Sequence, residues 1–194
     1  MLDIETLGTE PDSIVTELGI YTFSKNDSYV PDSLYGRIGI TDQIHAGRTM
    51  SSDTLKWHFE KNAINFLEYI DADKSNVDDA LIALKLFVEA EKKKMPGSKI
   101  YIWANSPIFD IIILKDLYKS LGYPIEETIF NEDLFKYQTI MDYRTIANLI
   151  NKEDLDFIKQ GAESESEEGS YHNALYDAIH QSKVLMKIAD YLGD

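Results

Sequence analysis

The sequence predicts a mixed α/β fold, in which helices flank a sheet, and three observations carry this prediction. Three short segments near the N-terminus are rich in β-branched and aromatic residues, which is typical of neighbouring strands. The rest of the chain alternates segments of helical apolar spacing with one short apolar segment. Strands first, followed by alternating helix and strand, are typical of a layered fold with a mixed sheet.

The three N-terminal strands are expected over residues 1–6, 14–23 and 34–40. Segment 24–33, between the second and the third, is polar and suits a connection between strands. Together these segments predict an antiparallel meander. A further buried strand is expected over 99–104, between two segments with helical spacing.

Helices are expected wherever apolar residues recur with helical spacing. Ser75 is the expected N-cap of one of them, and Pro96-Gly97 and Gly122 are expected to end two. The expected helices cover residues 51–62, 75–94, 107–122, 142–150 and 173–192. Residues 161–170 contain almost no apolar side chain and are expected to form a flexible acidic loop.

Composition limits the class of protein. A chain of 194 residues suits a single domain spanning 1–194. The net charge of −15 argues against a large nucleic-acid-binding surface, but not against an enzyme whose acids bind divalent cations and which grips few nucleotides. The absence of cysteine excludes disulfides and thiolate metal sites. The sequence has no long apolar run and no signal-peptide pattern, so we expect a cytoplasmic protein with no membrane partner.

Two acids lie one residue apart in the first expected strand. Because side chains alternate between the faces of a strand, Asp3 and Glu5 project to one side, and Leu2 and Ile4 to the other. Two neighbouring carboxylates repel each other unless a cation lies between them or one takes up a proton. A solvated N-terminal strand is enough to explain this pair of acids. A functional role for the pair therefore depends on whether the rest of the chain supplies partners.

Three more residues can join the pair. Asp110 lies in an apolar run of an expected helix, where an acid needs a partner or a cation unless it faces solvent. Asp177 lies early in the last expected helix, for which Asn173 is a good N-cap. His172 then lies in the preceding loop and can approach the same site, although an exposed loop histidine without a role is the simpler explanation of His172 alone.

These residues resemble the motifs of the DEDDh 3'→5' exonucleases, which have an RNase H-like fold. The motifs are Asp3-x-Glu5-Thr6, Asp110 in N-x-x-x-F-D, and His172-x4-Asp177, in that order over nearly the whole chain. The chain is most similar to the small stand-alone branch that contains the T-even phage exonuclease A and a mycobacterial exoribonuclease. The segments "TLKWHF", "DYRTI" and "WANSPIFD" resemble motifs of that branch, with His58 in place of a second tryptophan. The resemblance implies an antiparallel meander plus parallel strands, flanked by helices.

The resemblance also implies an activity: hydrolysis of single-stranded DNA or RNA from the 3' end, releasing nucleoside 5'-monophosphates. It implies two divalent ions, and carboxylate ligands without thiolates suit Mg²⁺ or Mn²⁺. The implied ligands are Asp3, Glu5, Asp110 and Asp177, and the implied general base is His172, whose ordinary pKa suits that role near neutral pH. The residues implied to contact substrate are Thr6, Leu7, Gly8, Trp57, Asn105, Phe109 and Arg144.

Three alternatives remain open. The chain can be an internal nuclease like an RNase H, a catalytically silent nucleic-acid-binding module, or a structural domain that binds cations. The spacing of His172 and Asp177 weighs against the first, and the filled catalytic positions weigh against the second. The residues do not choose between DNA and RNA. A phage source, with action in the host cytoplasm, is implied by likeness alone. No role is assigned to His45, His58 or His180.

Overall fold

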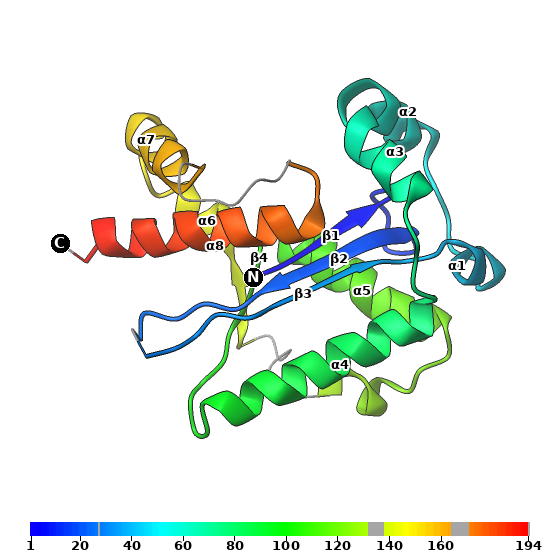
Figure 1. Ribbon diagram of the computed structural model, residues 1–194, viewed down its shortest axis with the longest axis horizontal. Coiled ribbons are helices and arrows are strands. Elements are labelled where there is room, and N and C mark those ends of the chain that lie inside the picture. The colour runs from blue at the N-terminus through cyan, green and yellow to red at the C-terminus, as the bar shows by residue number, and fades with distance from the viewer. Residues whose placement is uncertain (27, 132–137, 164–170, 194) are drawn as a thin grey trace.

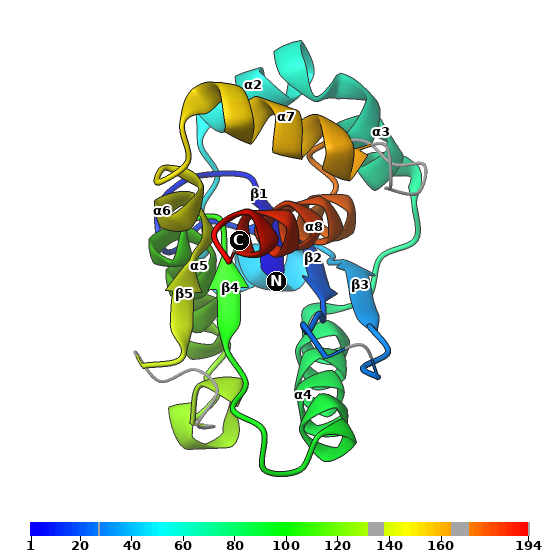
Figure 2. The ribbon, with the colours of Figure 1, turned by 90° about the vertical axis from the view of Figure 1, so that its left-hand side faces the viewer.

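The first three strands form the antiparallel meander that the sequence predicts. In the computed structural model, β1 (Leu2–Thr6) pairs with β2 (Val15–Tyr21), and β2 pairs with β3 (Ser33–Arg37), both antiparallel. A parallel pair, β4 (Ile102–Ala104) and β5 (Ile140–Asp142), lies beside β1 (Figure 2). The fold is therefore α/β with antiparallel and parallel strands, as predicted, and is consistent with an RNase H-like fold. The structure describes residues 1–26, 28–131, 138–163 and 171–193.

Long helices cover the two faces of the meander (Figure 1). Helix α8 (Ala174–Tyr191) packs on β1 and β2, and α4 (Val77–Lys94) lies along the opposite face. Helix α5 (Pro107–Ser120) contacts β1, β2, β4 and β5. The remaining described elements are α1 (Thr41–His45), α2 (Ser52–Lys61), α3 (Ala63–Asp71), α6 (Tyr143–Ala147), α7 (Lys152–Glu163) and two 3-10 turns, η1 (Ile125–Glu127) and η2 (Ile129–Asn131).

Side-chain caps fix where several helices begin. Ser51 accepts hydrogen bonds from the second and third amides of α2, and the predicted N-cap Asn173 accepts one from the Tyr176 amide in α8. The cap of α4 is Asn76, so the prediction of Ser75 was wrong. Ser75 instead exchanges backbone hydrogen bonds with Arg37 and Gly39, because this residue still pairs with the chain that leaves β3. Each of these caps satisfies an amide that the helix itself leaves unpaired.

Several expected boundaries differ from the structure. The strand expected over 99–104 begins only at Ile102, and the helix expected over 142–150 is shorter and follows directly on β5. Residues 161–163 belong to α7, not to an acidic loop, because the apolar face of that helix buries Ala162. The rest of the expected loop, residues 164–170, lies outside the described part of the chain. Helices α1, α3 and α7 and strand β5 were not predicted.

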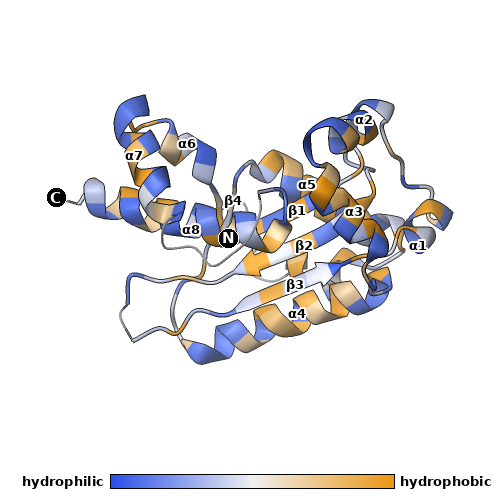
Figure 3. Cartoon of the chain, turned by 45° about the horizontal axis from the view of Figure 1, so that its top comes forward, coloured by the Kyte–Doolittle hydropathy of each residue, from blue (hydrophilic) through white to orange (hydrophobic). Residues whose placement is uncertain are grey.

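The main core fills the space between the meander and the helices α4 and α5. Leu2 and Ile4 of β1 point into it, 1% and 4% exposed, as the alternation in the first strand predicts. Figure 3 shows apolar residues along β1 and β2 and alternating apolar and polar stretches along α4. Among the described residues, no helix combines the length and apolar character needed to cross a membrane.

Gly19 of β2 allows α8 to lie directly against the meander. A Cβ built at Gly19 would stand 2.2 Å from the backbone carbon and oxygen of Ala174, in the first turn of α8. Gly19→Ala is therefore expected to push the helix outward and to lower the free energy of unfolding by about 1–3 kcal/mol. Urea unfolding measures this.

A matched control lies on the neighbouring strand. Gly36 of β3 pairs with Leu18, next to Gly19 in sequence, and a Cβ built at Gly36 meets nothing within 4 Å. Gly36→Ala is expected to leave stability nearly unchanged. Equal unfolding curves for the two variants would contradict the close packing of α8 on β2.

Candidate active site

A cleft of about 750 Å³ opens where β1, α5, α6, α7 and α8 meet. It is lined by most of the candidate site residues singled out in the sequence. These are Asp3, Glu5, Asn105, Phe109, Asp110, Arg144, His172 and Asp177. Segments more than 160 residues apart in the sequence thus come together in one cleft, and the five residues of the DEDDh pattern all line it.

Strand β1 presents Asp3 and Glu5 on the face that α8 covers. Asp3 is 9% exposed, and its Oδ1 accepts a hydrogen bond of 3.1 Å from Nε2 of Gln181 in α8. Glu5 pairs in register with Glu17 of β2, a second acid that is 4% exposed. The prediction that Asp3 and Glu5 share a face is confirmed, and neither belongs to a solvated strand.

Helix α5 brings Asp110 up to β1. Its carboxylate is 3% exposed, and its Oδ1 accepts a hydrogen bond of 3.3 Å from the Ile4 amide. That amide lies between Asp3 and Glu5 in the strand, so Asp110 joins their cluster. The alternative of a solvent-facing Asp110 is therefore wrong.

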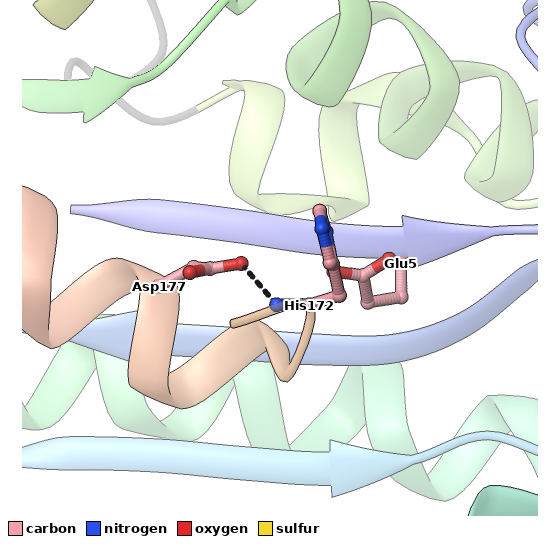
Figure 4. Close-up of side chains that lie close together, drawn as sticks. All are labelled: Glu5, His172 and Asp177. Carbon is pink, nitrogen blue, oxygen red and sulfur yellow. Dashed lines mark hydrogen bonds between the residues drawn. The ribbon is translucent and has the colours of Figure 1, made fainter. Parts of the chain in front are cut away.

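His172 and Asp177 reach the cleft from the start of α8. The His172 amide donates a hydrogen bond of 2.9 Å to Oδ2 of Asp177, and His172 has a φ of 66°, in the left-handed region. Its ring lies edge-on to Trp57, with centroids 4.7 Å apart. Figure 4 shows the ring beside Glu5 and the backbone nitrogen facing Asp177. Glu5, His172 and Asp177 each have a ligand atom within 4.8 Å of the other two.

Burial raises the pKa of every carboxyl in this cluster, and repulsion between its acids adds to this effect at Asp3 and Glu5. The pKa of Asp3 lies well above its usual range because of burial and of the charges on Asp110, Glu5 and Asp177. Burial first, then the neighbouring acids, raises the pKa of Glu5 to about 8, and burial raises the pKa of Asp110 to about 7. The pKa of Asp177 rises to about 6, mainly through burial. The four groups cannot all be ionised at neutral pH without a nearby positive charge.

The cluster has the chemistry of a site for hard divalent cations. Its donors are carboxylate oxygens, which Mg²⁺ and Mn²⁺ prefer. The side-chain oxygen of Gln181 is also buried here, and it has no hydrogen-bond partner. Such an orphaned acceptor costs free energy unless something else satisfies it. The donors present therefore fit a divalent metal.

The comparison with known families agrees with this geometry. A family model described as the 3'-5' exoribonuclease Rv2179c-like domain matches residues 1–189. The chain belongs to this family. The predicted resemblance to the mycobacterial-type exoribonuclease branch is confirmed, and this Rv2179c-like chain is a nuclease of the hydrolase class. No curated protein gives a significant match.

Four residues expected to contact substrate do not line the cleft of this Rv2179c-like domain. They are Thr6, Leu7, Gly8 and Trp57. Leu7 is 3% exposed and packs in a small core with Ile14, Phe66 and Tyr69. Thr6 donates a hydrogen bond to the Gly8 carbonyl, and Trp57 contacts the ring of His172. Contact of these four with substrate stays a prediction.

His58, which stands where the branch has a second tryptophan, is buried and hydrogen-bonded to the backbone at the end of β1. It is 3% exposed, and its Nε2 lies 2.9 Å from the Thr6 carbonyl oxygen. The side-chain amide of Asn62 lies 3.4 Å from Nδ1, so Nδ1 is the acceptor and Nε2 the donor to Thr6. His58 therefore holds the end of β1 just beyond Glu5.

Sequence analysis missed several residues of the site. Gln181 follows Asp177 by four residues, so helical spacing places both on one face and is a signal that could have found it. His180 lines the cleft and is 5% exposed, although it was given no role. Lys159 of α7 and Tyr171 also line it, and no pattern in the sequence indicates either.

Adding Mn²⁺ is expected to raise the thermal midpoint more at about pH 8 than at about pH 5.5. Acids whose folded pKa is raised stabilise the folded state at low pH, and this contribution is lost as pH rises through the folded pKa values of about 6 to 8. The metal-free protein is thus destabilised as pH rises, whereas a cation favours the ionised carboxyls. Calorimetry with and without EDTA measures both midpoints, and an equal shift at the two pH values would contradict the prediction.

Proposed function

We propose that residues 1–194 act as a single exonuclease domain that removes nucleoside 5'-monophosphates from the 3' ends of single-stranded RNA or DNA. The observation that carries this proposal is the convergence of four carboxylates and one histidine in one cleft. Membership of an exoribonuclease family supports RNA as the substrate. The five residues match the set that phosphodiester hydrolysis with two metal ions requires.

Asp3, Glu5, Asp110 and Asp177 would hold two divalent ions, Mg²⁺ or Mn²⁺. When bound, such ions promote attack by water and stabilise the charge on the phosphoryl and leaving oxygens. The residues come from β1, α5 and α8, which pack on one another, so the ligand set depends on the assembled fold. Burial of Asp3 and Asp110 excludes the bulk water that would otherwise screen these charges.

His172 is the proposed general base. Its partial burial lowers the pKa of the imidazole, so the ring is neutral near pH 7 and can accept a proton from the attacking water. Asp177 fixes the backbone of His172 through the amide hydrogen bond, and Trp57 supports the ring from the side. The histidine is thereby held beside Glu5 without sharing a helix with the metal ligands.

Arg144 is the proposed contact to the substrate backbone. It lines the cleft, and its charge acts on Asp110 in the direction that lowers the pKa of that carboxyl. A guanidinium in this place can pair with a phosphate oxygen of the bound strand. Asn105 and Phe109, which also line the cleft, are proposed to contact the terminal nucleotide.

A ladder assay tests the proposal. Four 5'-labelled single strands are used, DNA and RNA of one sequence, each with a free or a blocked 3' end. Each is incubated with Mn²⁺, Mg²⁺ or EDTA, with the wild type, with His172→Ala and with His45→Ala, an exposed histidine of α1, as the matched control. We expect a metal-dependent one-nucleotide ladder only from free 3' ends, retained by the control and lost in His172→Ala.

The other outcomes decide between the alternatives. Products from the blocked strands would identify internal cutting. Strands that remain intact under all conditions, although the protein binds them, would identify a silent binding module. Equal ladders from the wild type and His172→Ala would remove the histidine from the mechanism while leaving the exonuclease in place.

A further inference from the structure

Gln181 is the one amide side chain that touches the carboxylate cluster by a hydrogen bond among the described residues. It lies on α8 one turn beyond Asp177, on the same face of the helix. Asp177 faces Glu5, and Gln181 reaches Asp3, two residues earlier in β1. Helix α8 therefore places two side chains, one turn apart, against Asp3 and Glu5 of β1.

The two ends of the Gln181 amide have different surroundings. Its Nε2 donates to Oδ1 of Asp3 at 3.1 Å, whereas its Oε1 is buried without a hydrogen-bond partner. The side chain is 8% exposed and lines the cleft. The nitrogen carries the only hydrogen-bond donors of the amide, so its contact with Asp3 leaves the oxygen as an acceptor without a donor.

Packing alone does not explain an amide at this position. Buried side chains near it on α8 include the apolar Ala178, Val184 and Leu185. The buried hydroxyl of Ser182 differs from the Gln181 oxygen, because it has a partner in the Ala178 carbonyl. An apolar side chain of similar size would fill the same space without the desolvation cost of an unpaired carbonyl. The unpaired oxygen therefore points to a ligand that the cleft binds.

We propose that Gln181 is a positioning residue of the cation site, which orients Asp3 through Nε2 and offers Oε1 as an additional oxygen to a bound divalent cation. Amide oxygens are accepted ligands of hard cations. A hydrogen bond to one carboxylate oxygen fixes the rotation of the Asp3 carboxylate, so that its other oxygen stays available. This inference rests on the proposed function, because it assumes that the carboxylate cluster binds divalent cations.

The test measures Mn²⁺ binding without nucleic acid, through the electron paramagnetic resonance signal of free Mn²⁺. Gln181→Met keeps the volume of the side chain and removes both polar ends. Gln160→Met, at an exposed glutamine of α7, is the matched control, and Asp177→Asn is the reference for a lost ligand. We expect Gln181→Met to raise the Kd for Mn²⁺ about ten- to a hundredfold, with no change in Gln160→Met.

Stability separates positioning from packing. Gln181→Met removes an unpaired buried carbonyl and also the donor to Asp3, two changes with opposite effects on stability. The metal-free variant is therefore expected to unfold within about 3 °C of the wild type. Gln181→Leu repeats both measurements with a differently shaped side chain. A loss of Mn²⁺ affinity together with a large fall of the metal-free midpoint in both variants would assign Gln181 a structural role and overturn the proposal.

Two further results distinguish this inference from the proposed function. If the wild type binds Mn²⁺, Asp177→Asn does not, and Gln181→Met binds within twofold of the wild type, only the role of Gln181 is overturned. If the wild type itself binds no Mn²⁺, the cation site is overturned, and the role of Gln181 with it.

Discussion

Asp3→Asn is expected to abolish nuclease activity and, at the same time, to stabilise the metal-free protein. The proposed site loses the carboxylate at its centre, so hydrolysis should fall on the order of a thousandfold or more. The same substitution removes a buried acid that Asp110, Glu5 and Asp177 all repel. At about pH 8 the thermal midpoint without metal is expected to rise by about 2–4 °C, the equivalent of about 1 kcal/mol at this chain length.

Both effects are measured on one preparation, by the ladder assay with Mn²⁺ and by calorimetry in EDTA. Asp156→Asn, at an exposed acid of α7, is the control and should change neither. A variant that loses activity because it unfolds would contradict the prediction. So would one that keeps its activity, since Asp3 would then not be a ligand.

Arg48→Met is expected to cause a large loss of stability. The Arg48 side chain is fully buried, and its guanidinium donates to the carbonyls of Pro11 and Ser13 and to the side chains of Asp116 and Ser120. Methionine leaves two carbonyls unpaired and Asp116 without its cation. A buried carbonyl left without a donor costs about 1–3 kcal/mol, whereas Asp116, whose side chain is 31% exposed, is partly hydrated after its cation is removed. We therefore expect a loss of about 2–4 kcal/mol.

Urea unfolding, followed by circular dichroism, measures this loss. Lys119→Met, at an exposed cation of the same helix that carries Asp116, is the control and should stay within about 0.5 kcal/mol of the wild type. A loss below about 1 kcal/mol in Arg48→Met would mean that water replaces the guanidinium. The loop between β1 and β2 would then not depend on Arg48.

The parts of the fold that the sequence predicts are those with strong local patterns. The three strands of the meander alternate or carry β-branched runs, and α4, α5 and α8 repeat their apolar residues with helical spacing. Capping residues and glycines predicted where several helices begin or end. Asn173 is the N-cap of α8, and Gly122, with a φ of 79°, follows the end of α5. The motif residues were found because their order along the chain resembles a known family.

The parts that were missed depend on contacts between distant segments. Strand β5 has three residues, and its identity as a strand comes from pairing with β4, which no local pattern encodes. Helix α7 has an apolar face, but its many charged residues make the helical spacing of the apolar ones hard to recognise in the sequence. The role of Glu17 depends on register: it lies opposite Glu5, and one of its carboxylate oxygens accepts from the Ala174 amide at the start of α8.

The pairing of β1 with β2 also bears on how the chain selects its native strand register. A slip of β1 by one residue would turn Leu2 and Ile4 away from the core and push Asp3 and Glu5 into it. Two unpaired carboxylates among aliphatic side chains are far more costly than two misplaced aliphatic ones. The same acids that give the cleft its chemistry therefore penalise any slip of this five-residue strand by an odd number of residues, and so help it to select its native register.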